Sequence, residues 1–121
     1  MPQPERILPM VLALVIGLMG SLPATAALAS PDLDNGSQIF SANCAACHMG
    51  GGNVIRASRT LSKADLQAHL DAYSQDHLEA IEHQIEIGKN AMPPYQGKLS
   101  DADIADVAAY VEEQAERGWQ R

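Results

Sequence analysis

The stretch ANCAACHMGGG, residues 42–52, holds both cysteines of the chain, and His48 directly follows the second of them. Cys44 and Cys47 are three positions apart, so a helix would present their thiols from the same side of one turn. The three glycines that follow Met49 favour a loop that ends this helix. A chain of 121 residues has room for one domain. A site that needs two thiols and an imidazole so close together should therefore organise the whole fold.

Three kinds of site use cysteine and histidine in this way. A disulfide or a thioredoxin-like redox pair is the first, but the redox pair opens a helix after a strand, and no strand pattern precedes Cys44. A zinc site is the second, but it needs four ligands, and Cys44, Cys47 and His48 supply three. The third is covalent haem attachment, for which Cys-x-x-Cys-His is the recognised signature. The pattern predicts one haem c, with thioethers at Cys44 and Cys47 and with His48 as an axial ligand of the iron.

The composition agrees with a bulky buried cofactor. The chain has one tryptophan, three tyrosines and one phenylalanine. A domain this small buries a modest fraction of its surface, and large side chains normally carry much of that burial. A large apolar cofactor would supply the volume that these residues do not.

The first 29 residues have the features of a signal peptide. Their apolar run, residues 7–19, is interrupted by Pro9 and is too short to span a bilayer, and small residues near Ala29 suit cleavage. We therefore expect a signal peptide at 1–29 and an exported domain at 30–121. An uncleaved membrane anchor is the alternative.

The charge of the chain excludes some partners. The formal net charge is −7, and removal of the leader leaves it unchanged because the leader holds one basic and one acidic residue. Nucleic-acid binding needs clustered lysine and arginine, and the chain has no such cluster. Anionic membrane surfaces are disfavoured for the same reason, and a partner with a basic patch is favoured.

The apolar periodicity predicts an all-α domain of about four helices, and no segment has the alternation of a strand. The first helix should have Asp34 as its N-cap and should continue to about Cys47. Ile39 and Phe40 should lie on its apolar side.

The three later helices have their own start and stop signals. The second should follow Ser62, which has capping-box-like spacing with Asp65; the third should span 76–87 and stop at Gly88; the fourth should have Ser100 as its N-cap. Their expected apolar faces are Leu66, Leu70 and Tyr73, then Leu78, Ile81 and Ile85, then Ile104, Val107, Ala108 and Val111.

Met92 is the expected second axial ligand. It lies in NAMPPYQGKL, residues 90–99, where two prolines and a glycine exclude a helix. Pro93 and Pro94 restrict the loop, so a thioether held there loses little freedom on binding. Met49 cannot take this role, because it adjoins His48 and cannot reach the opposite face of a haem.

Other ionisable residues are expected on solvated helix faces rather than in a site. Histidines and carboxylates with many charged neighbours are usually surface residues. These are His69, His77 and His83, and Glu79, Glu82 and Glu86.

Three segments, residues 35–55, 88–104 and 106–119, resemble the class I c-type cytochromes, and most closely their cytochrome c6 branch. The resemblance implies a small all-α domain whose terminal helices cross beside one covalently attached haem. It implies that Gly36 lets these helices approach closely, with Phe40 and Tyr110 packed at the crossing. It also implies that Gln84 lies near the haem and adjusts its potential.

The resemblance includes a departure at the expected docking surface. The family often has MPAFGGRL where this chain has MPPYQGKL, residues 92–99. Lys98 therefore stands where an arginine is implicated in docking, and lysine keeps the charge without the planar fork of donors. We expect the exposed haem edge between residues 50–53 and 93–98, with uncharged side chains as the contact patch and Lys98 as a local exception.

Ligation by His48 and Met92 would saturate the iron and raise its potential, which favours one-electron transfer over enzymatic catalysis. The resemblance implies a soluble monomeric carrier in the thylakoid lumen or periplasm. It would pass electrons from the cytochrome b6f complex to photosystem I, with a terminal oxidase as a second acceptor. The alternatives are a haem enzyme of peroxidase type in which Met92 does not bind, and a c-type cytochrome that serves a non-photosynthetic acceptor.

Overall fold

The computed structural model describes residues 20–21 and 30–120. The predicted signal peptide lies outside the described residues except for Gly20 and Ser21, so this prediction and the cleavage near Ala29 stay predictions. Among the residues that are described, no helix is long and apolar enough to cross a membrane.

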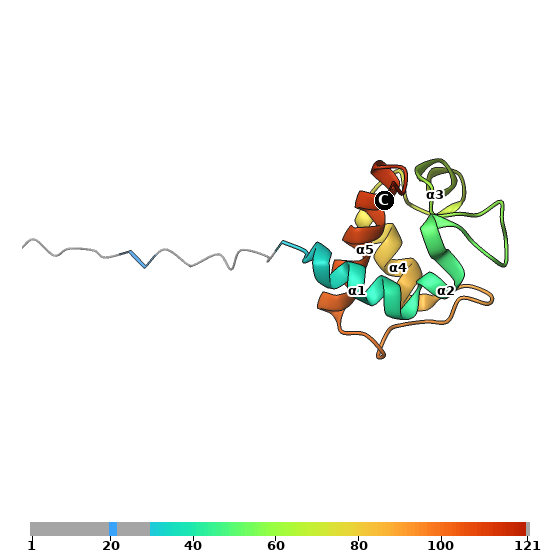
Figure 1. Ribbon diagram of the computed structural model, residues 1–121. Coiled ribbons are helices and arrows are strands. Elements are labelled where there is room, and N and C mark those ends of the chain that lie inside the picture. The colour runs from blue at the N-terminus through green and yellow to red at the C-terminus, as the bar shows by residue number, and fades with distance from the viewer. Residues whose placement is uncertain (1–19, 22–29, 121) are drawn as a thin grey trace, which may run out of the picture.

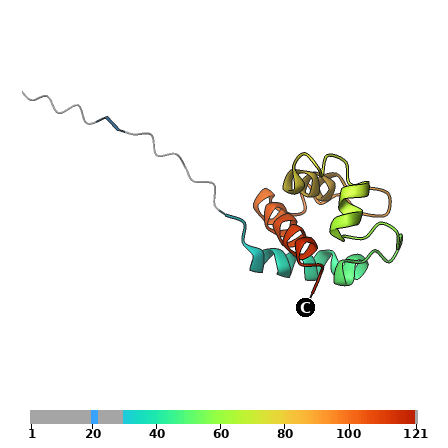
Figure 2. The same cartoon turned by 90° about the horizontal axis from the view of Figure 1, so that it is seen from above.

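The domain is built from helices, as the sequence predicts. The elements are α1 (Leu33–Asn43), α2 (Ala45–His48), the 3-10 turn η1 (Met49–Gly51), α3 (Lys63–His69), α4 (His77–Ile87) and α5 (Asp101–Glu116). α5 crosses α1 and also packs against α4, and α3 lies beyond them near the end of α5 (Figures 1 and 2). Over residues 30–120 the β pairing consists of two isolated bridges. The described part of the chain contains five α-helices rather than the four predicted, because a break at Cys44 divides the first predicted helix.

Helix α1 begins two residues earlier than predicted. Its N-cap is Asp32, whose side chain accepts a hydrogen bond from the Asn35 amide at 3.0 Å. Asp34 lies inside the first turn, so its assignment as the N-cap is wrong. Asp34 still complements the positive end of the helix from that position.

The crossing of α1 and α5 depends on Gly36. A Cβ atom at this position would collide with the backbone carbonyl of Asp106 on α5. Next to it, the side-chain amide of Asn35 donates to Asp103 at 2.9 Å and to Asp106 at 2.8 Å. One turn further on, the ring of Phe40 packs 5.4 Å from that of Tyr110. The close approach implied by the family resemblance is therefore present.

Helix α3 is shorter than its apolar pattern indicates. Ser62 is the N-cap, as predicted, and accepts from the Asp65 amide at 3.1 Å. The Asp65 carboxylate does not complete a capping box, because it accepts from the amide and hydroxyl of Thr60 instead. The helix ends at His69, so Tyr73 lies beyond it, although its side chain is buried.

Helix α4 has the predicted boundaries, with Asp76 as N-cap and Gly88 after its last residue. Ile81 and Ile85 are buried as expected, but Leu78 is 38% exposed and Ala80 takes its place in the core. The reason lies in the first turn, where His77 bonds to Glu112 of α5. The first turn of α4 therefore contacts α5 through the polar side chain of His77, and Leu78 faces outward.

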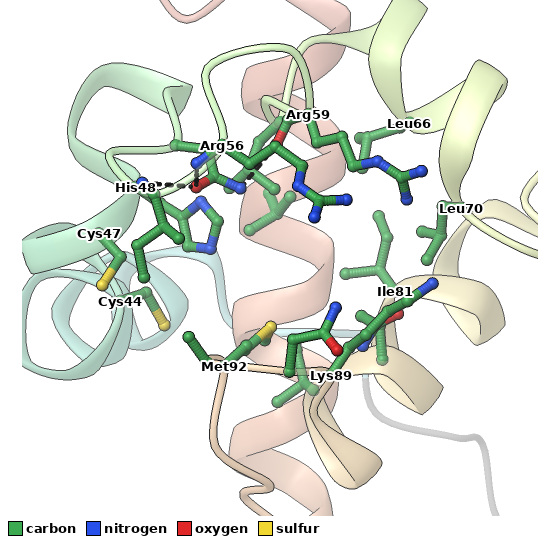
Figure 3. A pocket seen from close by; sticks show the side chains of 18 of the residues that line it. Cys44, Cys47, His48, Arg56, Arg59, Leu66, Leu70, Ile81, Lys89 and Met92 are labelled. Atoms are coloured by element: carbon green, nitrogen blue, oxygen red, sulfur yellow. Dashed lines mark hydrogen bonds between the residues drawn. The ribbon is translucent and has the colours of Figure 1, made fainter.

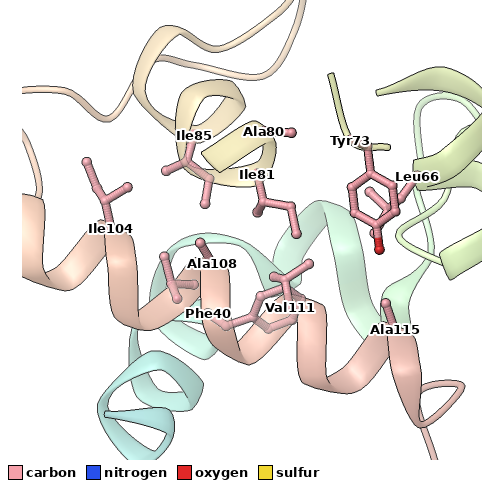
Figure 4. Packing of buried hydrophobic residues seen from close by; sticks show 11 residues of the cluster. Phe40, Leu66, Tyr73, Ala80, Ile81, Ile85, Ile104, Ala108, Val111 and Ala115 are labelled. Atoms are coloured by element: carbon pink, nitrogen blue, oxygen red, sulfur yellow. The ribbon is translucent and has the colours of Figure 1, made fainter. Parts of the chain in front are cut away.

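The core lies around α4 and α5, with Phe40 of α1, Leu66 of α3 and Tyr73 packed against them (Figure 4). Ser100 caps α5, and its predicted apolar face is buried throughout. The buried apolar residues are Phe40, Leu66, Tyr73, Ala80, Ile81, Ile85, Ile104, Val107, Ala108, Val111 and Ala115. The segment between α4 and α5 is irregular, as its prolines predict.

Candidate functional site

A cavity of about 500 Å³ opens between the helices. Its walls come from the end of α1, from α2, from the loop 53–61, and from α3, α4, the loop 89–95 and α5. Five of the predicted site residues border it: Cys44, Cys47, His48, Gln84 and Met92 (Figure 3). Segments that are distant in sequence therefore meet at one place.

The break between α1 and α2 presents the cysteine motif to this cavity. Cys44 is both the C-cap of α1 and the N-cap of α2, and the amides of Cys47 and His48 both donate to its carbonyl. The two cysteines are free thiols, Cys44 half-buried and Cys47 exposed. Burial raises the pKa of the Cys44 thiol to about 11, so the unmodified side chain is protonated at neutral pH.

The imidazole of His48 is oriented by a backbone contact. Its Nδ1 lies 2.8 Å from the carbonyl oxygen of Gly52, and a carbonyl can only accept, so Nδ1 carries the proton. Nε2 is then the nitrogen with a free lone pair. A hydrogen bond of this kind fixes the ring and raises its basicity as a metal ligand.

Met92 approaches the same cavity from the loop after α4. Its amide donates to the Lys89 carbonyl at 2.9 Å, and the Lys89 amide donates to the Met92 carbonyl at 3.0 Å. Gly88 has a φ of 63°, and a Cβ atom there would collide with the Met92 carbonyl. This tight turn holds the Met92 backbone against the end of α4, with its side chain toward the cavity (Figure 3).

Gln84 offers a test of whether a cofactor fits. Its Nε2 is buried and has no hydrogen-bond partner among the described residues. A buried donor without a partner is destabilising, by about 1–3 kcal/mol. The donor set agrees with this: two thiols, an imidazole nitrogen and a thioether border a cavity that has mainly apolar walls. These residues fit a covalently held haem.

Three basic residues at the cavity were not singled out from the sequence. Arg56, Arg59 and Lys89 line it, and the two guanidinium groups extend along it in Figure 3. Asn53 holds their loop, because its side chain accepts from the Arg56 amide at 2.9 Å and donates to the Arg59 carbonyl at 2.9 Å. The sequence did hold a signal for them, because basic residues close to the cysteine motif stand out in a chain that is acidic as a whole. Their charges suit the carboxylates that a haem carries.

The other histidines differ from one another. His83 is exposed as predicted, whereas His69 is exposed but also lines the cavity. His77 is partly solvated: its side chain is 40% exposed, but it also contacts two other side chains. Its Nδ1 lies 2.6 Å from the Glu112 carboxylate, and its ring stacks on Tyr73 with centroids 4.0 Å apart.

The acidic stripe of α4 is only partly solvated. Glu79 is exposed, whereas Glu82 and Glu86 are half-buried. Burial, with the neighbouring charges of Glu79, Glu86 and Asp76, raises the pKa of Glu82 above its usual range.

The exposed apolar residues near the cysteine motif are not the ones that the sequence predicts for the contact patch. Gly51 is buried beneath Trp119, while its neighbours Met49, Val54 and Ile55 are 69%, 71% and 66% exposed. Exposed apolar surface is therefore present, but it flanks the predicted range 50–53. Lys98 lies outside the cavity lining, and its ammonium group lies 5.8 Å from the centre of the Tyr95 ring. Docking through Lys98 stays a prediction.

Comparison with known proteins identifies relatives over nearly all of the described domain. A family model described as cytochrome c oxidase, cbb3-type, subunit III, matches residues 31–111. Cytochrome c6 of Limnospira maxima is 56% identical over 73% of this chain and 99% of its own length. Cytochrome c6 of Thermosynechococcus vestitus is 52% identical over 90% of this chain and 92% of its own. The solved structure of cytochrome c6 from the diatom Phaeodactylum tricornutum has a TM-score of 0.67 and 50% identity, covering 73% of this chain and 99% of that one.

Proposed function

The chain belongs to the cytochrome c6 family of class I c-type cytochromes, and on this basis we propose that it carries single electrons from the cytochrome b6f complex to photosystem I. Members of the family are electron carriers with one covalently attached haem c. The supporting observation is that two cysteine thiols, His48, Met92 and Gln84, whose Nε2 has no hydrogen-bond partner within residues 30–120, border one cavity.

The residues around the cavity would take distinct roles. Cys44 and Cys47 would anchor the haem through thioether bonds, and His48 and Met92 would be the axial ligands. When bound, the haem supplies a one-electron couple, and methionine–histidine ligation raises its potential. The Gly52 carbonyl fixes the proton on His48 Nδ1, so Nε2 keeps the lone pair for the iron.

The apolar walls would exclude water from the haem and limit the reorganisation that accompanies a change of charge. They are formed by Leu66, Ile81, Ile85, Val107 and Val111. Saturated ligation leaves no open position for a substrate, which supports a carrier rather than a haem enzyme.

The assignment of Met92 predicts a spectroscopic loss. Met92→Ala should abolish the weak near-red charge-transfer band of methionine-bound ferric haem, lower the midpoint potential and let carbon monoxide bind the ferrous protein. Met49→Ala is the matched control, since Met49 adjoins His48 and is exposed, and it should leave all three properties unchanged. The assignment is wrong if His69→Ala, which also alters a residue of the cavity lining, produces these changes and Met92→Ala does not.

Flash kinetics with purified photosystem I tests the carrier function. The reduction rate of the flash-oxidised centre should rise with the concentration of the haem-loaded protein. It should fall as salt is added, because the net charge of −7 would steer the protein to a basic docking site and screening acts within about 8–10 Å at physiological ionic strength. A rate that does not rise with concentration at any salt would rule out the donor function.

Variants of Lys98 locate the docking surface in the same assay. Lys98→Ala should slow the reaction by roughly threefold, since an exposed ion pair contributes at most about 1 kcal/mol, and Lys98→Glu should slow it further. Lys63→Ala is the control, because Lys63 is already paired with Glu116 on α5. Glu79→Gln should also have a smaller effect than Lys98→Ala. Equal effects at Lys63 and Lys98 would argue against a local role of Lys98.

We further propose that residues 1–29 are removed on export and that the mature carrier works in the thylakoid lumen or periplasm. The intact mass of the native protein decides this, with a start near Ser30 as the expected result.

A further inference from the structure

The break at Cys44 leaves the backbone carbonyl of Asn43 without a helical partner. In a continuous helix the Cys47 amide would donate to the carbonyl of Asn43. Here the Cys47 amide donates to Cys44 at 3.1 Å, and α1 ends at Asn43. The Asn43 carbonyl instead accepts a hydrogen bond from the hydroxyl of Tyr95 at 3.0 Å.

Tyr95 itself is firmly held in the loop that carries Met92. Its amide donates to the Ile85 carbonyl of α4 at 2.9 Å. Its own carbonyl accepts from the amides of Lys98 and Leu99, at 2.9 and 3.0 Å. The half-buried ring lines the cavity. The backbone on the loop side is therefore fixed, and the hydroxyl has a defined position.

The bond between Tyr95 and Asn43 joins two segments that border the cavity and lie 52 positions apart in the sequence. One segment carries Cys44, Cys47 and His48, and the other carries Met92. Within residues 30–120, it is the one hydrogen bond between the loop 88–100 and the segment 33–52. If this bond is lost, the loop keeps its anchors to α4 but has no polar link to the cysteine segment.

We propose that Tyr95 is a positioning residue that holds the Met92 loop closed over the haem site through its hydrogen bond to the Asn43 carbonyl. This inference rests on the proposed ligation by Met92. Opening of the loop, with displacement of Met92 from the iron, requires the Tyr95–Asn43 bond to break. The hydroxyl therefore lowers the population of the open state in which an external ligand can reach the iron.

Cyanide binding to the ferric haem-loaded protein measures this open state. External cyanide can bind only after Met92 has left, so its binding rate reports on loop opening. Tyr95→Phe keeps the ring and removes the hydroxyl, and it should speed cyanide binding by roughly fivefold, as expected for the loss of one hydrogen bond. The near-red methionine band should persist, because the closed form still predominates.

Two other tyrosine-to-phenylalanine variants separate a positioning function from general stability. The Tyr73 hydroxyl donates to Glu112 at 2.7 Å, away from the Met92 loop, so Tyr73→Phe should lower the free energy of unfolding in denaturant but leave the cyanide rate within twofold of the wild type. The Tyr110 ring packs against Phe40 and Trp119 rather than against the Met92 loop, and Tyr110→Phe, which keeps this ring, should change neither quantity.

The outcomes distinguish this inference from the proposed function. An unchanged cyanide rate in Tyr95→Phe, or an equal increase in Tyr95→Phe and Tyr73→Phe, overturns the positioning function of Tyr95 and leaves Met92 as a ligand. A wild-type ferric protein that lacks the methionine band and binds cyanide at once overturns the ligation by Met92, and the function of Tyr95 with it. An increase confined to Tyr95→Phe supports both.

Discussion

Gln84 places an amide group against a cavity whose walls are mainly apolar, and its Nε2 lacks a partner among the described residues. The hydrogens of an amide nitrogen are the positive end of its dipole. Facing a haem, they would stabilise the reduced form, which carries one electron more. In a medium of low polarity such a dipole acts strongly, because little water is present to screen it.

Gln84→Leu is therefore expected to lower the midpoint potential by some tens of millivolts, where about 59 mV corresponds to a tenfold change in a one-electron equilibrium. A redox titration of the purified protein measures the shift. Gln67→Leu on α3 is the matched control, since Gln67 is exposed, and it should leave the potential unchanged. An unchanged potential in Gln84→Leu would mean that the amide does not interact with the haem.

At the scale of single residues, several of the candidate site residues can be identified from the spacing of the sequence and by elimination of alternatives. The positions of Cys44, Cys47 and His48 follow from one helical turn, and Met92 from its restricted loop. Arg56 and Arg59 could not be placed in this way, because a side-chain hydrogen bond from Asn53 sets the shape of their loop. The contact of Tyr95 with Asn43 could not be predicted either, because it depends on a helix break that the sequence pattern does not indicate.

The crossing of α1 and α5 gives a prediction about helices. An alanine in place of glycine normally stabilises a helix by up to about 1 kcal/mol. At Gly36 the added Cβ atom would collide with a backbone carbonyl of α5, and the backbone can yield only if the helices separate. Overpacking of this kind destabilises by about 1–3 kcal/mol.

We therefore expect Gly36→Ala to lower the free energy of unfolding of the haem-loaded protein in denaturant, despite the gain in helix propensity. Gln38→Ala, at an exposed position of the same helix, should change it by less than about 0.5 kcal/mol. A more stable Gly36→Ala variant would show that the two helices are not packed as closely as described.

At the scale of helices, the boundaries were predictable where a cap and a stop residue coincide, as at Asp76 and Gly88 of α4. The start of α1 was predicted wrongly because two acidic residues close together, Asp32 and Asp34, are both acceptable N-caps in the sequence. The burial of Leu78 was predicted wrongly because helical spacing identifies a face. It does not show where a polar side chain such as His77 makes the contact with the next helix.

At the scale of the whole molecule, the hydrophobic core is small compared with the cavity inside the domain. The core of residues 30–120 contains eleven buried apolar residues, and six of them line a cavity of about 500 Å³: Phe40, Leu66, Ile81, Ile85, Val107 and Val111. An unfilled cavity loses the dispersion contacts of its walls and destabilises the fold in proportion to its volume. The haem is therefore expected to be a large part of the core, as the scarcity of aromatic residues in the sequence predicts.

Removal of both anchors tests this expectation. The double variant Cys44→Ala, Cys47→Ala should lose its haem colour on a denaturing gel and should show reduced helicity by circular dichroism without a cooperative thermal transition. The haem-loaded wild type, expressed in the same way, is the control. A colourless double variant that melts cooperatively would show that the polypeptide folds without its cofactor.

The order in which the chain is synthesised also determines when the parts of the cavity become available. Val107 and Val111, which form one wall of the cavity, are synthesised well after the cysteine motif, and so is Trp119. The indole of Trp119 lies against Gly51, just after the cysteine motif, and donates to the carbonyl of Leu61 at 2.9 Å. Until these residues have been added, Gly51 lacks the indole that covers it and the cavity lacks the wall that α5 supplies. Within residues 30–120, the order of the elements therefore places the cysteine motif before the helix that completes the cavity around it.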